Sequence, residues 1–417
     1  MTQSTSLASF FGSDTGFLDD LLRRVASKLQ LSETEYELAE DRYEGVGSWL
    51  AREGGEIAHL DPSIYPQGSV RIGTTVQPIG RDEFDVDLVC EFDCDWTKVD
   101  NPLDVLYTVE RCLRRNGNYA DLVGRKNRCI RLNYAGEFHM DILPACPVKD
   151  ADDDRIKVPD QETSEWTDSN PEGYATWFER QAEERESVQF REHEPIPDRE
   201  DADQKAPLKR AVQLLKRARD VAYKSHDHLT EDPPISVVLT TIAGHFYTGE
   251  VSVFDVLGGI LGKTEHAIQQ ARHSDNGGRL SVLNPAVKTD DFLEFREGAT
   301  TEGRLVVLNP TNAEEDFSER WDDDRASYED FVDWTKELNR VWDDLRTVDD
   351  IPEAKDRLSN LFGEDLTSEA IQDQAEFIHN EQGNGAVGVS ATGAIASEKN
   401  RSERSGSRVR RNTYYGE

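Results

Sequence analysis

The segment DEFDVDLVC, residues 82–90, alternates apolar and acidic side chains, and this pattern constrains the fold more than any other stretch of the sequence. Phe84, Val86 and Leu88 occupy every second position, with Asp85 and Asp87 between them. Alternate side chains of a β-strand point to opposite faces, so one face packs into a core while the other presents two carboxylates. The pattern therefore predicts a strand over 84–92 that holds both carboxylates rigidly on one side.

Acidic residues are abundant elsewhere, which makes a carboxylate pair weak evidence by itself. The 417 residues include 83 Asp and Glu against 48 Lys and Arg, a formal net charge of −35. This charge disfavours general binding of nucleic acids or of anionic membranes. Because only 14 of the basic residues are Lys, the composition favours a halophilic, salt-adapted protein over an ordinary acidic enzyme. Several similar pairs lie in polar runs and are interpreted as solvated: Asp93/Asp95, Asp152/Asp154, Asp201/Asp203 and Asp322/Asp324.

The cysteines and the hydropathy pattern predict a cytoplasmic protein. The five cysteines are odd in number and show no Cys-x-x-Cys spacing, so we expect reduced thiols, mostly buried, with neither a disulfide nor a zinc site. The N-terminal segment lacks a basic stretch followed by an apolar run, and no apolar stretch approaches 18 residues. We therefore expect no signal peptide and no membrane span. The cysteines are Cys90, Cys94, Cys112, Cys129 and Cys146.

The periodicity predicts a mixed first half and a helical second half. Two helices are expected between residues 15 and 53, the second starting at a capping box formed by Ser32 and Glu35. Strands are expected at 56–60, 84–92, 128–134 and 137–143. Residues 149–204 are polar and enclose one short helix, and later helices are expected at 206–224, 234–247, 251–258, 327–345 and 352–362.

These elements suggest three parts. We expect a first domain over 1–204, a helical domain over 205–380 that closes a cleft, and a flexible tail over 381–417. The tail is rich in Gly, Ser and Ala and shows no periodicity, a composition that cannot bury enough apolar surface to fold.

Two further segments supply candidate site residues. In YPQGSVRIGTTV, Gly68 allows a close approach of backbone to ligand, and Ser69 opens a short helix whose free N–H groups favour a phosphate. In EFHMDILPACPV, the alternation places Asp141 opposite the apolar face of another strand. Three carboxylates on neighbouring strands, Asp85, Asp87 and Asp141, would suit two Mg²⁺ ions, which prefer oxygen ligands and assist phosphoryl transfer. If the Asp85/Asp87 strand and the Gly68–Ser69 segment were absent, Asp141 would be interpreted as an ordinary residue at a strand end.

The basic segment KAPLKRAVQLLKRARDVAYK, residues 205–224, carries a net charge of +6 in this acidic chain. An apolar stripe leaves Lys209 and Lys216 on a common side of the expected helix. The segment is either a solvated helix face or a clamp for a triphosphate, and we favour the clamp.

Taken together, GSVRIGTTV, DEFDVDLV and FHMDILP resemble the active-site signature of the polymerase-β-like nucleotidyltransferases. Within them the chain most resembles the cGAS/DncV-like nucleotidyltransferases (CD-NTases), the signalling-nucleotide synthases of anti-phage CBASS systems. The resemblance implies an α+β fold: a nucleotidyltransferase core with an N-terminal helical spine and a C-terminal helical domain. It also implies that Asp85, Asp87 and Asp141 are catalytic and hold two Mg²⁺ ions, with Mn²⁺ as a substitute.

The same resemblance implies a set of nucleotide-binding residues. Gly68 and Ser69, with Gln67 beside them, would bind the donor triphosphate, and Lys216 and Ser236 would bind it from two helices of the second half. Relatives such as cGAS follow that serine with a base-stacking tyrosine, whereas Val237 stands here, so the sequence leaves base selection open.

The resulting hypothesis is Mg²⁺-dependent synthesis of a cyclic di- or trinucleotide from ATP or other NTPs, which would act on a CBASS effector. The alternatives are a tRNA-tailing or small-molecule nucleotidyltransferase, and a non-catalytic nucleotide-binding module. In some relatives, conjugating enzymes attach the synthase through a small C-terminal residue. Here Gly416 is penultimate and Glu417 is last, which departs from that pattern.

Overall fold

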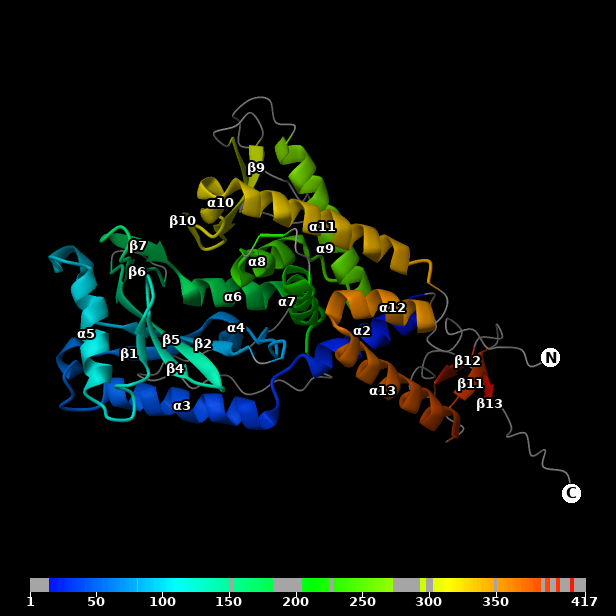
Figure 1. Ribbon diagram of the computed structural model, residues 1–417, viewed down its shortest axis with the longest axis horizontal. Helices are drawn as coiled ribbons and strands as arrows, with labels where there is room; N and C mark the ends of the chain where they lie inside the picture. Colours follow the sequence, from blue (N-terminus) through cyan, green and yellow to red (C-terminus); the bar gives the residue numbers. More distant parts are fainter. Residues whose placement is uncertain are drawn as a thin grey trace, which may run out of the picture.

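The computed structural model places a mixed β-sheet at one end of the molecule and a group of helices at the other (Figure 1). The structure describes residues 15–80, 82–149, 154–182, 205–225, 229–230, 232–272, 293–297, 303–348, 351–383, 387–390, 395–397 and 406–408.

The sheet has seven strands and contains the segment DEFDVDLVC. Its main path runs β1-β2-β5-β4-β3, and β6 pairs with both β5 and β7. The pair β2–β5 is parallel and the other pairs are antiparallel. The strands are β1 (Ser63–Gln67), β2 (Phe84–Glu91), β3 (Val123–Arg125), β4 (Ile130–Tyr134), β5 (Phe138–Pro147), β6 (Ile156–Pro159) and β7 (Trp166–Ser169).

Two helices cover the apolar face of the sheet. These are α3 (Glu33–Ala51) and α5 (Leu103–Arg114), and their buried side chains share a hydrophobic cluster with Val86, Leu88 and Met140. The helix α3 begins at the expected capping box: Ser32 Oγ accepts from Glu35 N at 3.2 Å, and Ser32 N donates to Glu35 Oε2 at 2.8 Å. The opposite face of β2 is left to Asp85 and Asp87.

The expected strand at 56–60 is wrong. Residues 58–60 form a 3₁₀ turn, and the strand β1 begins three residues later, at Ser63. The strand contains Pro66, which cannot donate a ladder hydrogen bond, but β1 lies at the sheet edge and needs only one partner.

The second half contains more helical residues than the periodicity predicted. Helix α9 extends fourteen residues past the expected end at 258, and α13 and the three-stranded sheet β10-β9-β8 were not expected. In the described part of the chain, no helix combines the length and apolarity needed to cross a membrane. These elements are α7 (Pro207–Ser225), α8 (Ser236–Phe246), α9 (Val253–Arg272), β8 (Leu293–Glu297), β9 (Gly303–Asn309), β10 (Asn312–Asp316), α10 (Arg320–Asp323), α11 (Arg325–Leu345), α12 (Ile351–Phe362) and α13 (Glu364–Gly383).

The first described helix, α2 (Gly16–Lys28), packs on the helical half rather than on the sheet (Figure 1). Its apolar face shares a cluster with α7, α9 and α13. Gln374 of α13 donates to Phe17 O at 2.8 Å and to Asp20 Oδ2 at 3.0 Å. Helix α6 (Pro171–Gln181) also contributes to this cluster through Phe178. Two segments that precede residue 204 therefore pack with the helical half, and the domain division at 204 stays a prediction.

The expected tail begins inside a helix, because residues 381–383 form the last turn of α13. Beyond it the structure describes three short strands in an antiparallel sheet, β11 (Val387–Ser390), β12 (Ile395–Ser397) and β13 (Gly406–Arg408). The flexible tail over 381–417 stays a prediction, and the rest of 384–417 lies outside the described residues.

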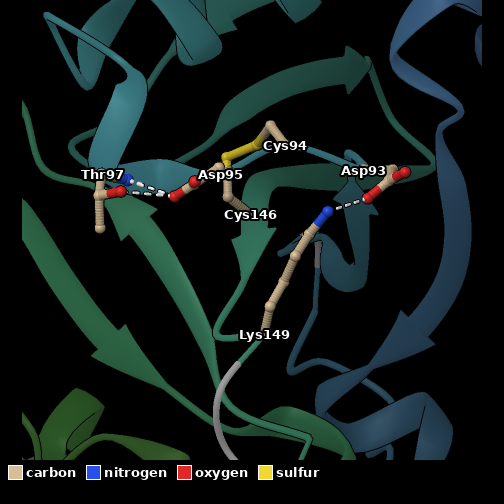
Figure 2. The surroundings of a disulfide bond; sticks show 6 residues. All are labelled: Asp93, Cys94, Asp95, Thr97, Cys146 and Lys149. Carbon is tan, nitrogen blue, oxygen red and sulfur yellow. Dashed lines mark hydrogen bonds and ion pairs between the residues drawn. A yellow bond between two sulfur atoms is a disulfide. The ribbon is translucent and has the colours of Figure 1, made fainter.

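A disulfide joins Cys94 and Cys146, so the expectation that all five cysteines are reduced is wrong for this pair (Figure 2). The chain leaving β2 stays beside β5, since Phe92 N donates to Ala145 O at 2.9 Å. The Cα atoms of Cys94 and Cys146 are consequently 5.5 Å apart, a usual separation for a disulfide. Of the described cysteines, Cys90, Cys112 and Cys129 are free.

Replacing both bridged cysteines by serine should lower the stability of the protein. The bridge spans 52 residues, and a loop of that size corresponds to about 4 kcal/mol of chain-entropy stabilisation. Denaturant unfolding of the wild type with and without reductant measures this effect, with the double serine variant as the control that reductant must not change. Equal midpoints for the oxidised and reduced wild type would contradict the assignment.

Candidate active site

The three carboxylates singled out from the sequence lie together on the open face of the sheet. Parallel pairing of β2 and β5 places Asp87 directly beside Asp141. Asp85 lies two residues before Asp87 on β2. All three line a cavity of about 590 Å³, which is within the usual size of ligand pockets. The side chain of Asp85 is 53% exposed and that of Asp141 is 16% exposed, so the group runs from the rim of the cavity inward.

Arg131 of β4 contacts two of these carboxylates and was not anticipated from the sequence. Its Nε donates to Asp141 Oδ1 at 2.7 Å, and its Nη2 donates to Asp141 Oδ2 at 2.6 Å and to Asp85 Oδ1 at 3.0 Å. The signal was present, because the buried residues Ile130 and Leu132 flank Arg131 and force it to the opposite face. What the sequence could not supply was the register that pairs Arg131 with Asp141.

Burial and mutual repulsion raise the pKa of two of the carboxyl groups. The pKa of Asp87 is raised to about 7, chiefly by burial and then by the charges of Asp141 and Asp85. The pKa of Asp85 is also raised by burial, an effect that Arg131 opposes. The site therefore concentrates more negative charge than Arg131 and the nearby Lys216 offset.

The donor set fits a divalent cation, since its carboxylate oxygens are the ligands that Mg²⁺ and Mn²⁺ prefer and its excess negative charge favours a cation. Among the described residues, no three or more His, Cys, Asp or Glu side chains form a ready-made coordination group. In this arrangement the Arg131 guanidinium contacts both oxygens of Asp141 and one of Asp85.

Gly68 brings the backbone into contact with the carboxylates. It lies at the junction of β1 and the short helix α4 (Gly68–Arg71), with a φ of +62°. A Cβ atom at this position would lie 2.5 Å from Asp87 Oδ2, closer than any real contact. Both the backbone conformation and the position of Asp87 therefore require glycine here.

Four of the five expected nucleotide-binding residues line the cavity. Ser69 and Gly68 line it, as do Lys216 of α7 and Ser236 at the start of α8. Gln67, the last residue of β1, lies outside the set of described residues that line the cavity. Its role in binding stays a prediction, as do the roles of the other four.

Gly68→Ala should reduce nucleotide binding and turnover about a hundredfold or more, because an added Cβ displaces the Asp87 carboxylate. Gly54→Ala is the matched control: Gly54 has a φ of +69°, but a Cβ added there would meet nothing within 4 Å. Both variants should lose about 1–2 kcal/mol of stability from the left-handed backbone. Full activity in Gly68→Ala, measured with purified protein, would show that the close approach is unimportant.

Lys216 is buried and points to the segment that follows α4. Its Nζ donates to Thr74 O at 3.0 Å and to Thr74 Oγ1 at 3.1 Å. Burial, followed by the charge of Arg219, lowers the pKa of Lys216 to about 7. Lys209 and Arg210 on the same helix are also buried, so the alternative of a solvated helix face is wrong for α7.

Arg219 connects the two helices and is a second residue that was not anticipated from the sequence. Its Nη1 donates to Pro234 O at 3.0 Å and to Ser236 Oγ at 3.1 Å, which fixes the start of α8 against α7. Lys216, Arg219 and Ser236 consequently form one wall of the cavity, across from the carboxylates of the sheet.

Asp87→Asn should make the protein more stable at neutral pH while removing a site carboxylate. The native carboxyl group has a pKa of about 7 against an ordinary 3.8, so the native state loses stability as pH rises from about 4 to 7. The variant lacks this loss and should gain on the order of 4 kcal/mol over the wild type above pH 7, with no difference below pH 4. Thermal unfolding between pH 4 and 8, in chelator and without nucleotide, measures the gain.

Asp121→Asn, at an exposed position, is the control for that series and should leave the pH profile unchanged. A constant difference between Asp87→Asn and wild type at every pH would contradict the raised pKa of Asp87.

Comparisons with known proteins find relatives among the synthases of second-messenger nucleotides. Residues 18–181 match the family model "Second Messenger Oligonucleotide or Dinucleotide Synthetase domain". A c-di-GMP synthase of Roseivirga ehrenbergii is 31% identical over 404 residues, which cover 96% of this chain and 97% of that protein. The cyclic dinucleotide synthase CdnG of Bradyrhizobium diazoefficiens is 27% identical over 299 residues, 66% of this chain and 70% of that one.

The solved structures support the fold. The structure of Bradyrhizobium diazoefficiens CdnG with GTP superposes with a TM-score of 0.63 at 23% identity, covering 86% of this chain and 99% of that one. The structure of E. coli MS115-1 CdnC with ATP gives a TM-score of 0.55 at 14% identity, covering 82% and 96%. The expected α+β, polymerase-β-like nucleotidyltransferase fold is thus confirmed.

The fold, together with the match to the family model and to the Roseivirga synthase, identifies a nucleotidyltransferase of the class that makes second-messenger oligonucleotides. The match over nearly the whole length of the Roseivirga synthase makes the assignment more specific: the chain belongs to the CD-NTase family.

Proposed function

We propose that this protein condenses nucleoside triphosphates into a cyclic dinucleotide, with GTP as the main substrate. The observation that carries the proposal is the cavity in which three sheet carboxylates, the Gly68–Ser69 turn and the Lys216–Ser236 wall converge. One relative that matches 96% of the chain is a c-di-GMP synthase, and CdnG was solved with GTP, which supports guanine over the other bases. Cyclic di-GMP is the product we expect.

The reaction joins the ribose hydroxyl of one nucleotide to the α-phosphorus of another and releases pyrophosphate. Asp141 would accept the hydroxyl proton, and Arg131 orients its carboxyl group through two hydrogen bonds. Asp85 and Asp87 would hold divalent cations, which supply charge for the attacking oxygen and the leaving pyrophosphate. A second condensation between the two linked nucleotides closes the ring.

The opposite wall binds the triphosphate. Lys216 would exchange its contacts with Thr74 for phosphate oxygens, and a bound polyanion would keep its ammonium charged although burial lowers the pKa to about 7. Gly68, Ser69 and Ser236 present small groups that leave the cavity open for the phosphates.

Four finer points belong to the same proposal. The cations would be two Mg²⁺ ions, ATP would be accepted as a second substrate, and the product would activate a CBASS effector in antiviral defence. The acidic, lysine-poor composition supports action in a salt-rich cytoplasm.

Incubation of the purified protein with all four NTPs and Mg²⁺, followed by mass spectrometry, tests the proposal. We expect pyrophosphate and a cyclic guanine dinucleotide, lost on addition of chelator and in Asp87→Asn. No product from any NTP would contradict enzymatic activity. A nucleotide added to tRNA or to a small molecule, without a cyclic product, would favour one of the alternative nucleotidyltransferases.

Lys216→Ala should raise the KM for NTP roughly tenfold or more and change kcat less, because the ammonium contacts phosphates in the ground state and the transition state alike. Lys209→Ala is the matched control on the same buried helix, since Lys209 does not line the cavity. An unchanged KM in Lys216→Ala, from initial rates at varied NTP, would remove the triphosphate role.

A further inference from the structure

Besides the carboxylates assigned to catalysis, three acidic side chains line the cavity among the described residues: Asp82, Glu83 and Asp220. Acidic groups repel a triphosphate, so their presence in this cavity needs another explanation. One oxygen of Glu83 accepts from Gly136 N at 2.6 Å, and the other lies 3.1 Å from His139 Nδ1. Asp82 lies on the segment before β2, is 57% exposed and forms an ion pair with Lys224.

Asp220 differs from the other two because it is held on a rigid helix with one oxygen left over. Arg219 donates to Asp220 Oδ1 from Nε at 2.8 Å and lies 2.7 Å from it through Nη2. Neither contact involves Oδ2, which has no hydrogen bond to a described residue. The side chain is 32% exposed, and its exposed part faces the cavity that it lines.

The position of Asp220 along α7 places it beside the triphosphate wall. Asp220 follows Lys216 by one helical turn, about 6 Å, on the same helix face. Arg219 links it to Ser236 at the start of α8, so its orientation is fixed to that wall. A nucleotide whose phosphates contact Lys216 and Ser236 has its base within reach of the next turns of α7.

We propose that Asp220 selects guanine by accepting, at Oδ2, a hydrogen bond from the 2-amino group of the bound base. Among the four bases only guanine carries an amino group at position 2, and Oδ2 is the oxygen that Arg219 leaves able to accept it. Adenine has no donor at position 2, and cytosine and uracil present a carbonyl oxygen there, which a carboxylate repels. This inference rests on the proposed function, since it names the feature that selects the substrate.

Tyr223 supports the same placement of the base. It lies seven residues after Lys216 on the same face of α7 and lines the cavity, as does Val237. Tyr223 therefore supplies an aromatic ring for stacking where Val237 cannot. Stacking is independent of base identity, so Tyr223 should affect all NTPs alike, in contrast to Asp220.

Inosine triphosphate tests the proposal on the wild-type protein, because it differs from GTP only in lacking the 2-amino group. Equilibrium binding of GTP, ITP and ATP analogues with a methylene bridge between the α- and β-phosphorus atoms avoids dependence on catalysis, because these analogues are not turned over. We expect ITP to bind roughly ten- to a hundredfold more weakly than GTP, since loss of one donor leaves a carboxylate oxygen unpaired. Equal binding of ITP and GTP by the wild type would overturn the inference.

Asp220→Asn then identifies the residue that reads the 2-amino group. The variant should bind GTP roughly ten- to a hundredfold more weakly and should no longer distinguish GTP from ITP. Asp82→Asn is the matched control and should keep the wild-type order of GTP, ITP and ATP, while Tyr223→Leu should weaken all three by a similar factor. An unchanged GTP to ITP ratio in a folded Asp220→Asn variant, checked by thermal unfolding, would overturn the role of Asp220.

These outcomes separate the inference from the proposed function. If the wild type makes a cyclic dinucleotide and Asp220→Asn retains the full preference for GTP over ITP, only the role of Asp220 fails. If the wild type makes no nucleotide product although it binds GTP more tightly than ITP, the proposed function fails, but recognition of the guanine 2-amino group is still supported.

Discussion

The parallel pairing of β2 with β5 is the constraint on which the site depends. It brings Asp87 beside Asp141 and leaves Asp85 on the same face. Three carboxylates therefore lie close together in a cavity, where water solvates their charges poorly. Arg131, paired with Asp141 on the next strand, supplies a fixed counter-charge. The apolar side of the same strands, packed against α3 and α5, keeps the backbone in place against this repulsion.

The wall opposite the sheet has the reverse electrostatic character although the whole chain carries −35 charges. Lys216, Arg219 and Lys224 follow one another along α7 and line the same cavity as the carboxylates. Lys216 is buried and carries a lowered pKa in the absence of a ligand. The cavity thus pairs an anionic sheet with a cationic helix, an arrangement suited to a substrate that carries phosphates at one end and reacts beside cation-binding carboxylates.

Local pattern was sufficient for the parts of the fold that depend on one element. The alternation at 84–92 located β2 and its two carboxylates, and the capping box located the start of α3. Long-range contacts were not predictable. Arg131 needed the β4–β5 register, and the disulfide needed β2 and β5 to be neighbours. The helix α9 was expected to end near Gly258, yet it continues, and α11 packs closely against it at this glycine: a Cβ there would lie 3.2 Å from Trp342.

The contact between α2 and α13 has a consequence for synthesis of the chain. Phe17 and Gln374, which meet through a hydrogen bond of 2.8 Å, are separated by 357 residues. At about 5–20 residues per second, translation reaches the second partner tens of seconds after the first. Helices α7 and α9 are synthesised within that interval, whereas α13, which also covers the apolar side of α2 in the finished protein, follows them. The helical half can therefore complete its core only after α13 has left the ribosome, and until then the part of α2 that α13 covers stays exposed.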